Sequence, residues 1–267
     1  MSERIKKIFE KKGKKLVTFT TGGDPDFNTS LEIFKTIINN GIDIIEIGMP
    51  FSDPMADGPT IQESSVRSLA NGTKINNIFE IVTNIREFNN EIPIILMGYY
   101  NSIFNLGIDN FIAQCAETGV DGLIIVDLQP EEDSELYIKS KEKNIDLIRL
   151  ITPTTDQNRL ITILSNASGF LYYVTVTGIT GQNSANIEDL KKSINTIKSS
   201  TKLPIVAGFG IKNKKDVEHI STFTDGVVVG SSIVNIIKDN LNDKNKMINE
   251  IKLFTKDLKE GIKEWIG

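Results

Sequence analysis

The sequence predicts an α/β protein folded as a (β/α)8 TIM barrel. Eight short apolar segments alternate with longer amphipathic segments along the 267 residues. Several of the short segments are apolar at consecutive positions, as in Ile94–Met97 and Val227–Val229, which is typical of parallel strands buried on both faces. Eight strand–helix pairs within about 220 residues match the barrel in size and number. An open, doubly wound sheet is the alternative, because spacing alone does not exclude it.

The apolar segments set the expected strands, and the amphipathic segments between them set the expected helices. The strands are predicted at Leu16–Thr21, Ile42–Gly48, Ile92–Met97, Gly122–Asp127, Asp146–Leu150, Gly169–Val176, Leu203–Ala207 and Gly226–Gly230. The helices are predicted near 28–40, 61–90, 108–118, 132–143, 156–165, 186–199, 213–221 and 231–240.

Both ends of the chain add a helix to this pattern. Ile5, Ile8 and Phe9 recur at helical spacing, and the segment from Asp243 to Trp265 is amphipathic. We therefore expect an extra N-terminal helix and an added C-terminal helix. Since no Pro/Gly/Ser-rich linker interrupts the pattern, residues 1–267 are predicted to form a single domain.

Composition excludes several classes of protein. With 39% hydrophobic and 24% charged residues, the chain has enough apolar material for a large core and is not intrinsically disordered. A net charge of −5 argues against binding to nucleic acid or to an anionic membrane surface. Apolar runs stay below the roughly 18 residues that a membrane span needs, and no targeting segment is apparent. A cytoplasmic protein is expected, or one of the plastid stroma if plastid-encoded.

One cysteine and one histidine limit the possible chemistry. Cys115 cannot form an intramolecular disulfide, and His219 would have to serve any His-based triad or metal site alone. Cys115 lies on the apolar face of a helix and is expected in the core. His219 is expected to be structural or at the surface, and the basic runs Lys11–Lys15 and Lys212–Lys215 are expected to be solvated. No metal site is predicted.

Glu46 is the most informative residue for function. It interrupts an apolar strand, where an ionised carboxylate without partners is costly. Burial there would raise its pKa and suit general acid–base work near neutral pH, although a structural ion pair is the competing explanation. Asp57, in the proline- and glycine-rich loop that follows, could face the same pocket, although a rigid connector is the competing explanation for this loop. One buried and one wetter carboxylate resemble a divided acid–base pair.

Three glycine-rich segments follow later strands. Residues 175–181 and 208–210 follow the predicted sixth and seventh strands, and Gly230-Ser231-Ser232 follows the eighth. Loops after strands seven and eight commonly bind phosphate in this fold, so a phosphorylated small molecule is the expected ligand. Ser231 or Ser232 acting as an ordinary N-cap is the alternative.

These motifs together resemble the tryptophan synthase alpha chain family. Residues 46–59 carry the signature, and further matches cover essentially the whole chain. They lie at 23–25, 99–101, 177–181, 208–210 and 230–231. The resemblance implies a lyase that cleaves indole-3-glycerol phosphate to indole and glyceraldehyde 3-phosphate by a retro-aldol reaction.

The resemblance also implies roles for individual residues. Glu46 and Asp57 would be catalytic, with Tyr172 orienting Glu46. The walls of the indole pocket would be Phe19, Met97, Tyr99, Ile124 and Phe209. The phosphate would be bound by Gly181, Gly210, Gly230 and Ser231, and Thr180 would belong to a lid.

The family works with a beta subunit that carries pyridoxal phosphate (PLP). The resemblance therefore implies an alpha2-beta2 complex, PLP on the partner and no cofactor on this chain. Three other hypotheses stay open: a stand-alone indole-releasing lyase, a binding module that only activates the beta subunit, and a phosphate-binding barrel with another substrate.

Overall fold

The computed structural model describes residues 1–174, 184–208 and 210–263. Its strands all run parallel within one sheet, in the order β5-β4-β3-β2-β1-β9-β8-β7-β6. They are β1 (Lys15–Thr21), β2 (Ile44–Gly48), β3 (Ile94–Gly98), β4 (Gly122–Ile125), β5 (Asp146–Leu147), β6 (Arg149–Ile151), β7 (Leu171–Val174), β8 (Ile205–Gly208) and β9 (Gly226–Val229).

The two ends of this sheet belong to one chain segment. Only Ile148 separates β5 from β6, and its amide donates to the Leu123 carbonyl oxygen at 2.9 Å. The sheet therefore comes round on itself at the predicted fifth strand, which is divided in two. The predicted TIM barrel is confirmed, and the open-sheet alternative is wrong.

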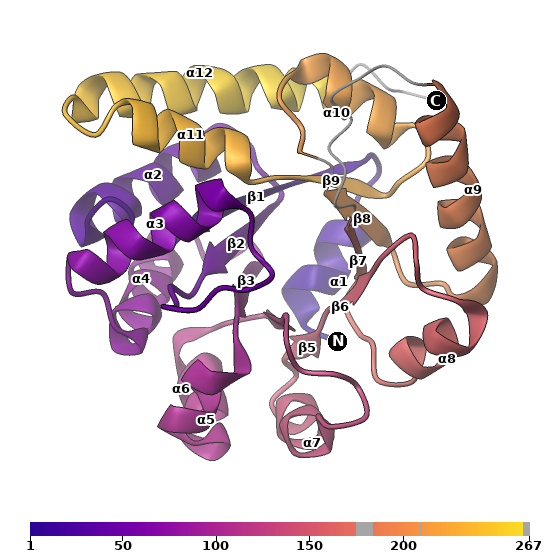
Figure 1. The fold of residues 1–267 in the computed structure, drawn as a ribbon. Helices are drawn as coiled ribbons and strands as arrows, with labels where there is room; N and C mark the ends of the chain where they lie inside the picture. The colour runs from indigo at the N-terminus through magenta and orange to yellow at the C-terminus, as the bar shows by residue number, and fades with distance from the viewer. Residues whose placement is uncertain (175–183, 209, 264–267) are drawn as a thin grey trace.

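Helices surround the strands (Figure 1). They are α1 (Glu3–Glu10), α2 (Phe27–Asn39), α3 (Pro59–Ala70), α4 (Ile75–Phe88), α5 (Tyr100–Leu106), α6 (Ile108–Thr118), α7 (Ser134–Glu142), α8 (Gln157–Ser165), α9 (Ser184–Ser200), α10 (Lys214–Ser221), α11 (Ser231–Asp239) and α12 (Lys244–Lys263). The expected terminal helices correspond to α1 and α12. Along the parts of the chain that the structure describes, no helix is both long and apolar enough to span a bilayer.

The predicted set of helices needs two corrections. The single helical pattern at 61–90 is two helices, since the chain turns at Gly72 with φ +82° between α3 and α4. The sequence pattern also missed α5, which begins directly after β3. Its first amide, on Tyr100, donates to the Asp127 carboxylate at 2.8 Å, which compensates one of the unpaired amides of a helix start.

Residues of each strand alternate between the barrel interior and the surrounding helices. Inward-facing apolar residues form one cluster, onto which α1 packs at the end of the barrel where the strands begin. Ile5 of α1 is fully buried in that cluster, and the Phe9 ring packs on Phe170 at 5.6 Å between centroids. The first helix thus closes the N-terminal end of the barrel.

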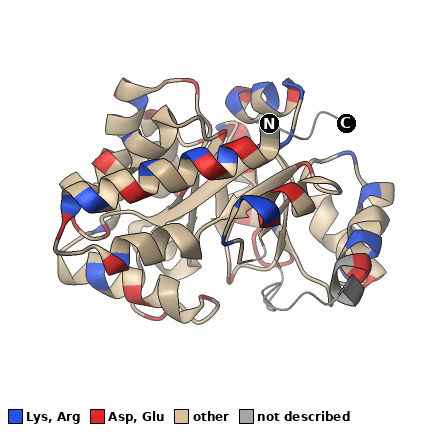
Figure 2. Cartoon of the chain, turned by 90° about the horizontal axis from the view of Figure 1, so that it is seen from above, with Lys and Arg blue, Asp and Glu red and all other residues tan. Residues whose placement is uncertain are grey.

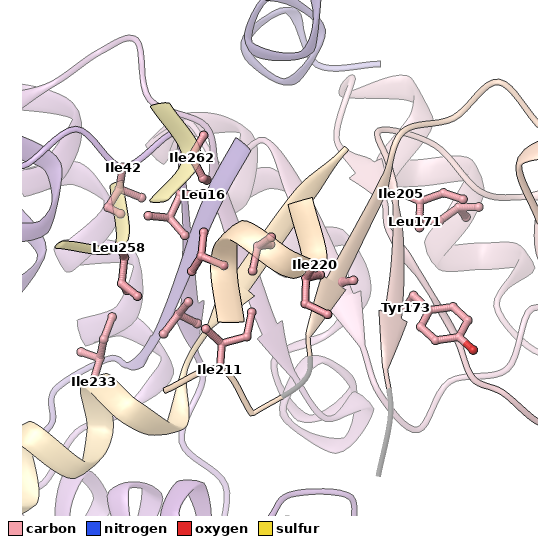
Figure 3. Close-up of a cluster of buried hydrophobic side chains, with 14 of the residues drawn as sticks. Leu16, Ile42, Leu171, Tyr173, Ile205, Ile211, Ile220, Ile233, Leu258 and Ile262 are labelled. Atoms are coloured by element: carbon pink, nitrogen blue, oxygen red, sulfur yellow. The ribbon is translucent and has the colours of Figure 1, made fainter. Parts of the chain in front are cut away.

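Outward-facing residues pack against the helices. Figure 3 shows part of this outer core, where Leu16 of β1 lies beside Leu258 and Ile262 of α12. Tyr173 of β7 faces α9 instead, since its hydroxyl hydrogen-bonds with Ser193. Cys115 is fully buried in a second outer cluster, as predicted. Figure 2 shows the charged residues concentrated on the helices and loops around nearly uncharged strands.

The basic runs follow the prediction only in part. Lys11 and Lys12 are exposed, as is His219 on α10. Lys15, however, is only 3% exposed, and its Nζ donates to the carbonyl oxygens of Lys11 (2.7 Å) and Gly13 (2.6 Å). The expectation that Lys11–Lys15 is fully solvated is therefore wrong for Lys15. Its ammonium donates hydrogen bonds to backbone carbonyl oxygens of the turn that precedes it.

Candidate functional site

Glu46 lies on β2 and faces the barrel interior. Its neighbour on the same face, Ile44, belongs to the interior cluster. Glu46 is 1% exposed, and neither carboxylate oxygen has a hydrogen-bond partner among the described residues. Burial, with a smaller contribution from the Asp57 carboxylate, raises the pKa of Glu46 to about 8. Such a group exchanges protons readily near neutral pH.

Asp57 belongs to the loop that connects β2 to α3. It is half-buried, and desolvation raises its pKa against the opposing effect of a hydrogen bond from Tyr99. The Tyr99 hydroxyl also accepts a hydrogen bond from the Ala56 amide at 3.0 Å, and its ring stacks on that of Phe51 with 5.3 Å between ring centroids. Tyr99 therefore fastens the loop that carries Asp57 to the end of β3, in addition to its expected place in the pocket wall.

Tyr172 faces inward from β7, across the barrel from Glu46. Burial first, and then the negative charge of Glu46, raise the pKa of Tyr172 well above its usual value. The phenol therefore stays neutral and can donate a hydrogen bond. Gly208 on the adjacent strand leaves room for it, since a Cβ there would lie 2.9 Å from the Tyr172 hydroxyl oxygen.

Three of the expected wall residues take inward positions on strands at the same side of the barrel as Glu46. Phe19 of β1 pairs in register with Glu46, and Met97 of β3 pairs with Ile124 of β4. Phe19 is close-fitted, because a Cβ on Gly48 would lie 2.6 Å from the end of its ring. The result is an apolar surface beside two carboxylates, suited to a flat aromatic group with one polar edge.

Two of the expected phosphate residues, Gly230 and Ser231, lie at the start of α11. Gly230 is the N-cap, and no side chain caps this helix. The alternative explanation of Ser231 and Ser232 as N-caps is therefore wrong. Ser231 is exposed, whereas the Ser232 hydroxyl donates to the Ile211 carbonyl oxygen at 2.5 Å. Uncapped amides at a helix N-terminus attract anions.

The remaining expected site residues divide into two groups. Gly210 follows β8 with φ +61°, a left-handed conformation that favours glycine. Thr180, Gly181 and Phe209 lie outside the described residues, so the roles expected of them stay predictions.

A salt bridge that the sequence did not predict supports the site. Arg67 of α3 donates to both oxygens of the buried Asp24, at 2.8 and 2.7 Å. The Ser68 hydroxyl donates to the Gly22 carbonyl oxygen at 2.7 Å. Together they hold α3, and with it the end of the Asp57 loop, against the turn after β1. A buried Asp24 signals a cation partner, but the sequence offers 30 lysines and arginines.

Comparison with known proteins decides the family. The family model of the tryptophan synthase alpha chain matches residues 5–263. The chain belongs to this family. A curated tryptophan synthase alpha chain from Petrotoga mobilis is 45% identical over 258 residues, which cover 96% of this chain and 98% of the relative.

Solved structures agree. Tryptophan synthase subunit alpha from Legionella pneumophila superposes with a TM-score of 0.91 at 34% identity, covering 99% of both chains. A protein from Aquifex aeolicus has a TM-score of 0.87 at 38% identity, covering 98% of both. The chain is thus an alpha subunit, a lyase of tryptophan biosynthesis that cleaves indole-3-glycerol phosphate, as the sequence predicted.

Proposed function

We propose that Glu46 carries both proton transfers in the cleavage of indole-3-glycerol phosphate. The supporting observation is a buried carboxyl group with two unpartnered oxygens and a pKa raised to about 8. The protonated Glu46 gives its proton to C3 of the indole, which forms an indolenine cation. The resulting carboxylate then takes the proton of the 3′-hydroxyl. The carbon–carbon bond breaks, its electron pair returns to the ring, and indole and glyceraldehyde 3-phosphate form.

We propose that Asp57 acts electrostatically in the same reaction. Its carboxylate would accept a hydrogen bond from the indole N–H and stabilise the positive charge that develops on that nitrogen. The hydrogen bond from Tyr99 and the fastened loop would hold it in place. Tyr172 would orient Glu46 through its neutral hydroxyl.

The same proposal gives the substrate its orientation. The indole would lie against Phe19, Met97, Tyr99 and Ile124. The phosphate would bind to backbone amides at Gly210, Gly230 and Ser231. Binding the phosphate firmly at one end places the reacting carbons at the carboxylates, which is how binding far from the reacting atoms lowers a barrier.

We further propose that a tryptophan synthase beta subunit covers the catalytic end of the barrel in an alpha2-beta2 complex. Met55 in the Asp57 loop is 85% exposed and Phe104 on α5 is 66% exposed, and both lie at the end where the strands terminate. Large exposed apolar side chains are typical of interaction surfaces. PLP would belong to the partner, with no cofactor on this chain, and the complex would work in the cytoplasm.

The test measures indole release from indole-3-glycerol phosphate by the purified chain, with and without a beta subunit. Glu46→Gln and Asp57→Asn should each lower turnover by about 10²–10⁴-fold. Glu142→Gln, an exposed carboxylate on α7 outside this loop, serves as the matched control. Near-normal turnover in Glu46→Gln would refute the acid–base assignment. Activity indifferent to the beta subunit would refute the partnership and favour a stand-alone lyase.

A further inference from the structure

A groove of about 1010 Å³ opens at the opposite end of the barrel from the catalytic carboxylates. Most of its residues lie in the segments that lead into β1, β2, β8 and β9, and the ends of α1, α9 and α12 complete it. From one end of β1 to the other, seven residues span roughly 20 Å. The groove is therefore separate from the proposed substrate site.

The charge of the groove contrasts with that of the chain. Seven lysines and three acidic residues line it, which leaves a formal charge of +4 in a chain whose net charge is −5. The lysines are Lys11, Lys12, Lys14, Lys15, Lys198, Lys202 and Lys259, and the acidic residues are Glu10, Asp43 and Asp225. These residues come from five separate parts of the sequence, so the fold itself gathers the positive charge.

The two aspartates of the groove are already engaged. Asp225 pairs with Lys198 at 3.1 Å, and Asp43 pairs with Lys259 at 2.5 Å. Lys11, Lys12 and Lys202 form no ion pair with any residue that the structure describes. Three ammonium groups are therefore available to a ligand.

The buried Lys15 makes this arrangement costly when no anion is present. Its ammonium is bonded to two carbonyl oxygens and has no carboxylate within ion-pair distance among the described residues. Burial lowers its pKa most, and the charges of Lys259, Lys11 and Lys14 lower it further against the attraction of Asp43. A bound anion would offset this repulsion between like charges.

We propose that this groove binds a small molecule that carries a chain of phosphates, such as inorganic triphosphate or a nucleoside triphosphate. Lysine binds phosphate as a point charge, and several phosphates in a row match a groove with four excess positive charges. The volume is that of a small-molecule site. Phe9, Leu203, Pro204 and Ile262 also line the groove and offer an apolar wall to an organic group.

The test measures binding of tripolyphosphate to the full chain by calorimetry, with EDTA present to exclude metal ions. The combined Lys11→Ala, Lys12→Ala and Lys202→Ala substitutions should weaken binding at least about tenfold. The matched control removes three exposed lysines outside the groove, Lys143, Lys252 and Lys256, and changes the net charge equally. It should weaken binding less than about twofold.

Comparison of anions then identifies the ligand class. Tripolyphosphate should bind more tightly than orthophosphate, and ATP binding more tightly than tripolyphosphate would mark the apolar wall as a base or sugar contact. Equal affinities for ATP and tripolyphosphate would show that the groove recognises only the phosphate chain. Equal losses in the two triple variants would show diffuse attraction to a charged surface and overturn the proposal. Unchanged binding in the groove variant, or equal affinities for orthophosphate and tripolyphosphate, would also overturn it.

Discussion

Replacing Glu46 by glutamine should change the pH dependence of stability in a specific direction. Folding raises the pKa of this carboxyl from 4.5 to about 8, so between these pH values the folded state binds more protons than the unfolded state. Stability must then fall as the pH rises through this window. At 1.36 kcal/mol per pKa unit, the loss contributed by Glu46 approaches about 5 kcal/mol above pH 8. Glutamine has a similar shape and no charge to bury.

The assay is urea denaturation of both proteins from pH 5 to pH 9. The two should differ by no more than about 1 kcal/mol in free energy of unfolding at pH 5, where Glu46 is protonated in the folded state. By pH 9 Glu46→Gln should be more stable than the wild type by up to about 5 kcal/mol. The other titratable groups are the same in both proteins, so their contributions largely cancel in the difference. Glu142→Gln, on the exposed face of α7, is the control and should follow the wild type at every pH. A stability difference between Glu46→Gln and wild type that does not change with pH would refute the burial argument.

Three further predictions concern buried groups. Arg67→Met leaves Asp24 buried without its partner and should cost about 3–5 kcal/mol in urea denaturation. Adding Asp24→Asn should restore part of the lost stability. A double variant no more stable than Arg67→Met would contradict the ion-pair explanation. Gly208→Ala places a Cβ 2.9 Å from the Tyr172 hydroxyl. It should cost about 1–3 kcal/mol and lower kcat more than it raises KM; unchanged kinetics would mean that the hydroxyl position is unimportant. Cys115, fully buried with a pKa raised by desolvation, should resist an aromatic disulfide reagent in the native protein and react in urea. Fast native labelling would show that its helix opens readily.

Much of the barrel could be predicted because its strands are buried on both faces. Consecutive apolar residues such as Ile94–Leu96 carry that signal within a few positions. Glu46 could be found for the same reason, since one carboxylate in an apolar strand is conspicuous. The division of the helical pattern at 61–90 was missed although Asn71-Gly72 is a turn signal, because apolar spacing continues on both sides of it.

Features that depend on distant partners were beyond pattern reasoning. Arg67 and Asp24 are 43 residues apart, and nothing local pairs them. The burial of Lys15 depends on carbonyl oxygens of its own turn together with the ends of other strands. The helix α5 has seven residues, which is too short for helical periodicity to appear in the sequence.

The closure of the barrel by α1 determines the route by which substrate enters and products leave. Because α1 closes the end of the barrel where the strands begin, the substrate and both products must pass through the opposite end, where Glu46 and Asp57 lie. A partner bound over that open end would contact every molecule that leaves. A ligand in the lysine-lined groove at the closed end, by contrast, would not contact the substrate. It would influence the reaction only through the strands that both sites share.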